Sequence, residues 1–146
     1  MKKSPIATAT IPTSATSVIV VILKSPAIEG SDPDWKAIAI DDRKKNFPKG
    51  GSYVSNFFSG DIRFVIGEHC GTLKPGGSYG DEMPKKRDNF NMTPVVVQFL
   101  HEGKWIIANE SALRFLPQVR FLVFAFVDPA SGRPRTMSFR DLKPLK

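Results

Sequence analysis

The chain has 146 residues, a length that favours one domain and can bury a core without a metal or disulfide staple. Its single cysteine excludes an intrachain disulfide, and no apolar run approaches the about 20 residues of a membrane-spanning helix. The net charge of +7 favours an anionic partner such as nucleic acid, an acidic glycan or anionic lipid.

The first half of the chain reads as short extended segments separated by turns. Residues 1–16 are small and polar, and we expect an extended or flexible N-terminal segment there. The β-branched run at 17–23 predicts a strand buried on both faces. Residues 35–41 alternate in polarity and predict its antiparallel partner across a Pro- and Gly-containing loop. Further strands are predicted at 52–58 and 62–66.

The second half continues the same pattern. The stretch "VIGEHCGTLKPGG" predicts a strand end, a glycine-bounded hairpin tip that holds His69 and Cys70, and a short return strand. A mobile loop is expected at 77–93. A hairpin turn with glycine at positive φ is expected at His101–Lys104. The remaining predicted elements are strands at 94–100, 105–108, 120–127 and 135–140, with turns at 109–111 and 128–134.

These segments amount to about eight strands with turn signals roughly every 8–12 residues and little or no helix. The pattern predicts an all-β fold, an antiparallel, immunoglobulin-like β-sandwich formed as a single domain by residues 17–143. A β-barrel fits the same pattern and remains the alternative.

Several turn motifs resemble an uncharacterised family of bacterial β-sandwich proteins that are usually exported. The motifs are Phe47-Pro48-Lys49-Gly50, Asn56-Phe57-Phe58-Ser59 and Leu73-Lys74-Pro75-Gly76, in that order. They are similar to the family's "Phe-Pro-x-Gly", "Asn-Leu-Ser" and "Leu-x-Pro-Gly" elements. The resemblance spans roughly residues 11–142. It implies an N-terminally shortened member and a periplasmic or extracellular location, and it implies no established activity.

Residue types that could carry chemistry are few. A zinc site needs about three or four convergent ligands, and the chain offers Cys70, His69 and His101. A nucleophilic cysteine needs an activating base, which His101 would supply only if the fold brought it to Cys70. Whether His69, Cys70 and His101 converge is a question of geometry. We therefore predict no catalytic residue, no metal site and no cofactor.

Two short basic runs are the candidate anion-binding residues: Arg43, Lys44 and Lys45, and Lys85, Lys86 and Arg87. Short runs of this kind are usually solvated loops. The sequence thus favours a non-enzymatic β-sandwich module with a structural or protein-interaction role. Its partner would be another protein or a second copy that pairs with an exposed sheet edge. The alternative is a module that binds an anionic polymer or glycan through these basic loops.

Overall fold

The computed structural model describes residues 6–24, 35–43 and 47–142, and every regular element in these residues is a β-strand. No helix in the described residues is long and apolar enough to cross a membrane. The chain divides into two compact units. One contains the described residues of Met1–Arg43 together with Val127–Arg133, and the other contains those of Lys44–Phe126 and Pro134–Lys146. The single domain expected at 17–143 stays a prediction.

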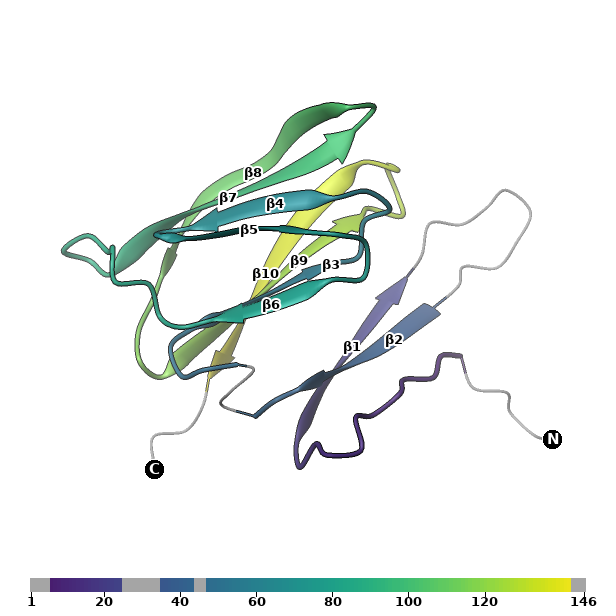
Figure 1. The fold of residues 1–146 in the computed structure, drawn as a ribbon, viewed down its shortest axis with the longest axis horizontal. Helices are drawn as coiled ribbons and strands as arrows, with labels where there is room; N and C mark the ends of the chain where they lie inside the picture. The colour runs from purple at the N-terminus through teal and green to yellow at the C-terminus, as the bar shows by residue number, and fades with distance from the viewer. Residues whose placement is uncertain (1–5, 25–34, 44–46, 143–146) are drawn as a thin grey trace. The chain divides into compact units, whose positions relative to one another are not determined.

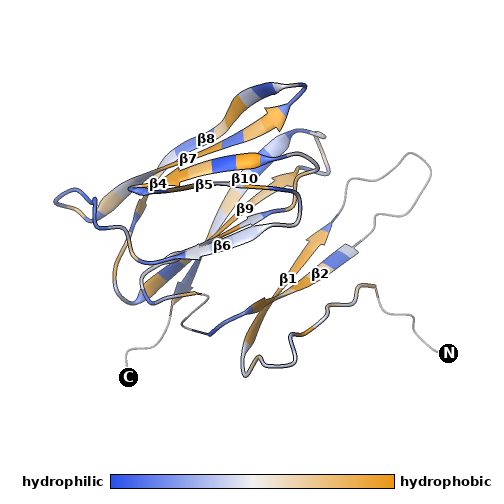
Figure 2. Cartoon of the chain, viewed as in Figure 1, coloured by the Kyte–Doolittle hydropathy of each residue, from blue (hydrophilic) through white to orange (hydrophobic). Residues whose placement is uncertain are grey.

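The first unit holds a two-stranded antiparallel sheet, β1 (Val18–Lys24) and β2 (Trp35–Asp41). Val18 lies opposite Asp41 and Lys24 opposite Trp35, so the predicted pairing across the intervening loop is confirmed. Figure 2 shows hydrophobic colouring along most of β1, as its β-branched sequence requires. Arg43 follows β2 and is held by the Asp41 carboxylate, with 2.9 Å and 2.8 Å between its Nε and the two oxygens.

The second unit contains two four-stranded sheets, drawn in Figure 1. The first has the order β10-β9-β3-β6, and its strands are β3 (Ser52–Asn56), β6 (Ser78–Asp81), β9 (Val119–Val127) and β10 (Pro134–Leu142). The second has the order β5-β4-β7-β8, and its strands are β4 (Ile62–Ile66), β5 (His69–Leu73), β7 (Met92–His101) and β8 (Lys104–Arg114). The all-β prediction is therefore confirmed, and the two sheets are consistent with a β-sandwich.

One pairing differs from the antiparallel expectation. β3 and β9 are parallel, with Ser52 opposite Phe121 and Asn56 opposite Ala125. Parallel neighbours need a long connection, and five strands separate β3 from β9 along the chain. Local alternation cannot reveal such a pair, because it reports which residues share a face and carries no strand direction.

The core lies between the two sheets. Alternate residues of β4 and β7 are buried, as the sequence predicts for a half-buried strand. Aromatic rings join the sheets: Phe64 of β4 lies 6.0 Å from Tyr79 of β6, and Phe99 of β7 lies 5.0 Å from Phe58, which follows β3. The largest fully buried apolar side chains of this unit are Phe47, Phe99, Phe115, Ile62 and Ile66.

Asn56 is a buried polar centre at the end of β3. Its side-chain amide donates to the carbonyls of Gly60 and Leu73 at 2.9 and 3.0 Å, and its side-chain oxygen accepts the Phe58 N–H at 2.9 Å. Its backbone is also bonded, to Gly76 and Gly77. The strand predicted at 52–58 therefore ends at residue 56, because the Phe58 amide is used by the Asn56 side chain rather than by a ladder.

Two elements lie where the sequence predicted loops or turns. β6 falls inside the loop expected at 77–93, and its residues Ser-Tyr-Gly-Asp carry no apolar alternation of their own. β8 continues through 109–111, where a turn was expected, to Arg114. In both cases a neighbouring strand supplies the order: β3 pairs with β6, and β7 pairs with β8 along its whole length.

Candidate functional site

The His69–Cys70 motif lies on a strand rather than at a hairpin tip. The turn is Gly67-Glu68, where Gly67 has a φ of +61°, and β5 begins at His69. The hairpin tip predicted at His69 and Cys70 is therefore wrong. The turn lies two residues earlier in the chain, because Gly67 adopts the positive φ that the turn requires. His69 lies opposite Ile66 and Cys70 opposite Val65, so the two side chains point to opposite faces of the sheet.

His69 connects the two sheets through a carboxylate. Its Nδ1 lies 2.8 Å from Oδ2 of Asp81, the last residue of β6, while its Nε2 lies 3.7 Å from Oε1 of Glu68. Glu68 in turn accepts the backbone N–H groups of Lys85 and Lys86 at 2.6 and 3.1 Å. These contacts join the edge of each sheet to the loop at 85–88.

The Glu68 carboxylate is strongly stabilised in its charged form. The hydrogen bond from the Lys85 N–H, assisted by the Lys86 N–H and opposed by partial burial, lowers the pKa of Glu68 to about 2 from its ordinary value of 4.5. A carboxyl held so firmly ionised at neutral pH is a poor general acid, because it carries no proton to donate.

His101 does not approach Cys70. Val95 of β7 lies beside Ile66 at one end of the strand, whereas His101 lies six residues further along, a separation of roughly 20 Å. Cys70 is exposed on the outer face of β5, beside Val65, in a shallow hollow of about 410 Å³. Among the described residues, no group of three or more histidine, cysteine or acidic side chains is arranged to hold a metal ion.

In the first basic run, the charge of Arg43 is paired with an acidic neighbour. Arg43 is bound to Asp41 and also donates to the Ser14 hydroxyl at 3.1 Å, so an acidic neighbour already meets its charge. Lys44 and Lys45 lie outside the described residues. The Arg43–Lys45 part of the anion-binding prediction therefore gains no support from the described geometry.

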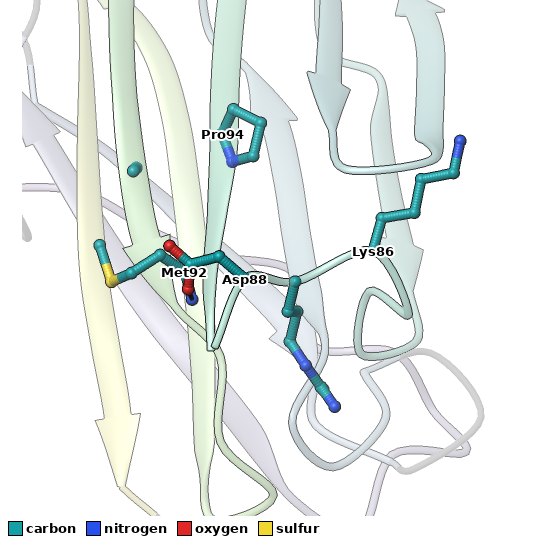
Figure 3. A pocket seen from close by; sticks show the side chains of 6 residues that line it. Lys86, Asp88, Met92 and Pro94 are labelled. Atoms are coloured by element: carbon teal, nitrogen blue, oxygen red, sulfur yellow. Dashed lines mark hydrogen bonds between the residues drawn. The ribbon is translucent and has the colours of Figure 1, made fainter. Parts of the chain in front are cut away.

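The second basic run is surrounded by acidic groups. Lys85 and Lys86 are exposed, but their backbones bind Glu68, and Asp88 accepts the Met92 N–H at 2.9 Å. Figure 3 shows Lys86 pointing away from Met92 and Pro94, which line a hollow of about 540 Å³ together with Arg87 and Ala112. Arg87 Nη1 is buried and has no hydrogen-bond partner within the described part of the chain.

The longest edge strand is β8. Among the described strands it pairs only with β7, and none of its 11 residues is buried. Ile106 and Ile107 are 46% and 55% exposed. β10 of the facing sheet approaches β8, but no ladder joins the two strands. A long edge strand of this kind presents unpaired backbone groups that can accept another strand.

The other sheet edges are better protected. β5 and β6 have 5 and 4 residues, and the His69–Asp81 contact ties them to each other. β10 begins with Pro134 and, like β8, carries three charged residues. Short length, proline and charge are the devices that keep sheet edges from pairing. β8 has none of them between Trp105 and Asn109, although it has a bulge at Ala108, which lacks a partner in β7.

No protein-family model matches the chain, and neither a curated protein nor a solved structure matches it. The resemblance to an exported bacterial β-sandwich family, and the immunoglobulin-like topology, therefore stay predictions.

Proposed function

We propose that this chain is a non-enzymatic protein-interaction module that receives an extended polypeptide segment at the free edge of β8. The observation that carries the proposal is the length and exposure of β8, whose only ladder among the described strands is with β7. Strand addition at such an edge gains affinity from main-chain hydrogen bonds and specificity from alternate side chains.

The residue chemistry supports an interaction role over catalysis. His69 is bound to Asp81, Cys70 faces the opposite side of the sheet, and His101 lies at the other end of β7. Nucleophilic catalysis needs a base within hydrogen-bond reach of the nucleophile, and Cys70 has none among the histidines of the chain. From the resemblance alone, we further propose a periplasmic or extracellular location, which cell fractionation tests.

Site-specific photo-crosslinking tests this function in cells that express the chain naturally. A photoreactive amino acid at Ser111, which is exposed on β8 of the full chain, is expected to give discrete protein adducts. The same group at Thr72, exposed on the shorter edge strand β5, is the matched control and is expected to give none. Equal adducts from both positions, or none from Ser111, would overturn strand addition at β8.

A second candidate function is binding of an anionic polymer or glycan through Lys85, Lys86 and Arg87. The observation in its favour is the buried Arg87 Nη1, which has no hydrogen-bond partner among the described residues. It ranks second because Glu68, Asp81 and Asp88 adjoin this loop and offset its positive charge. Retention on heparin that falls with salt, and is lost after charge reversal of Lys85 and Lys86, would favour it over the first proposal.

A further inference from the structure

The direction of the backbone groups on β8 follows from hydrogen bonds made by its neighbours. The Gly67 N–H donates to the carbonyl of Pro94, so the Pro94 backbone points toward β4. Pro94 lies opposite Ala112, and these two residues therefore form a non-hydrogen-bonded pair of the β7–β8 ladder. It follows that the N–H and C=O of Ala112 point away from β7, toward the open edge.

A second hydrogen bond gives the same result independently. The Phe115 N–H donates to the Asn91 carbonyl, on the β7 side. Backbone direction alternates along a strand, so Leu113 and Ser111 also point toward β7. Glu110, Ala112 and Arg114 therefore direct their N–H and C=O groups to the open edge. All three are exposed, and they lie beyond the bulge at Ala108, in a stretch that follows a regular register with β7.

The side chains on this stretch carry complementary charges. Glu110 and Arg114 lie two residues to either side of Ala112 and share its face of the sheet. Neither side chain has a hydrogen bond or ion pair with another described residue. Ala112 between them is small, so a second backbone can approach without a steric conflict.

We infer that the partner at β8 is a second copy of this chain, paired antiparallel through β8 with the two-fold axis at Ala112. This inference rests on the proposed function and deepens it. In this register Ala112 faces its own symmetry mate, and Glu110 of each copy faces Arg114 of the other. The backbone groups of all three pairs meet across the axis, and opposite charges lie directly across from each other at both ends. A self-complementary patch of this kind gives a closed dimer.

An axis at Ile107 is the competing register. It would place Lys104 opposite Glu110 of the second copy, which also matches charge. That register crosses the bulge at Ala108, where the alternation of backbone direction is broken, so the two edges would lose their regular hydrogen bonding. The Ala112 register uses only the stretch beyond the bulge.

Sedimentation of the purified full chain tests the inference by charge exchange. We expect the wild type to pass from 16.2 kDa to twice that mass as its concentration rises into the hundreds of micromolar. Glu110→Arg and Arg114→Glu each place like charges across the axis, and each is expected to weaken self-association at least tenfold. An equimolar mixture of the two variants restores opposite charges at both ends and is expected to dimerise like the wild type.

Lys104→Glu is the matched control, since Lys104 takes no part in the Ala112 register and its reversal is expected to leave the dimer unchanged. Recovery in the mixture also shows that both variants are folded. A wild type that stays monomeric, a mixture that fails to recover, or a dimer disrupted by Lys104→Glu would overturn the inference. Photo-crosslinking from Ser111 to a different protein, with a monomeric wild type, would reject the second copy and leave strand addition at β8 standing.

Discussion

Asn56 is a fully buried polar residue whose replacement should lower the stability of the second unit substantially. Asn56→Ala removes three side-chain hydrogen bonds and leaves the Phe58 N–H and the carbonyls of Gly60 and Leu73 without this partner. A hydrogen bond contributes about 1 kcal/mol, and a buried group left unpaired costs about 1–3 kcal/mol. Since Asn56 is fully buried, we expect the free energy of unfolding to fall by about 3–4 kcal/mol.

Urea unfolding followed by far-UV circular dichroism measures this loss, and the thermal midpoint is expected to fall by about 10 °C. Asn109→Ala is the matched control, because the Asn109 amide makes an exposed 3.3 Å contact with the Ser111 hydroxyl. Its effect should stay within about 0.5 kcal/mol. A loss of unfolding free energy below about 1 kcal/mol, or no larger than that of the control, would refute the role of the Asn56 hydrogen bonds in stabilising the fold.

A second substitution at the same position separates hydrogen bonding from shape. Asn56→Asp keeps the acceptor for the Phe58 N–H but turns an oxygen toward the carbonyls of Gly60 and Leu73. Burial and these carbonyls favour the protonated carboxyl, so the variant should be less stable than Asn56→Ala at neutral pH and recover part of the loss as pH falls. A variant whose stability relative to wild type is independent of pH would contradict this account.

Three other predictions test the geometry of the site region. Glu68 has a folded-state pKa lowered to about 2, so it adds stability that is present above pH 4.5 and is lost as pH falls toward 2. Glu68→Gln should reduce this dependence of the unfolding free energy on pH, measured by urea titrations at several pH values. An unchanged dependence would count against the hydrogen bonds that Glu68 accepts from Lys85 and Lys86. The Nε of buried Arg120 lies 2.9 Å from the Asp141 carboxylate, which Asp141→Ala removes. The free energy of unfolding should fall by about 2–4 kcal/mol in this variant. A loss under about 0.5 kcal/mol would show that the ion pair is not needed for stability. Cys70 is exposed, so the native chain should react with one equivalent of a thiol reagent. His101→Ala should leave the rate of this reaction unchanged. A slower reaction in that variant would mean that His101 assists the Cys70 thiol.

The sequence by itself determined those strands and turns whose own residues carry the pattern that forms them. Alternation at Ile62, Phe64 and Ile66 dictates β4, and the β-branched run at 17–23 dictates β1, because burying these side chains on a strand face removes apolar surface from water. The hairpin at His101–Lys104 was equally local: Glu102 and Gly103 both have positive φ, the backbone that a two-residue turn requires. The all-β class follows from the sum of such segments.

Only the tertiary structure decided what depends on partners distant in the chain. β6 and the far half of β8 have no apolar alternation and are strands because β3 and β7 offer them ladders. The parallel pairing of β3 with β9 and the contact of His69 with Asp81 join residues that no local pattern links. The open edge of β8 is of the same kind, since backbone direction at Ala112 follows from a hydrogen bond made by Pro94 and Gly67. A sequence specifies which side chains must be buried, whereas strand order decides which backbone groups are left unpaired.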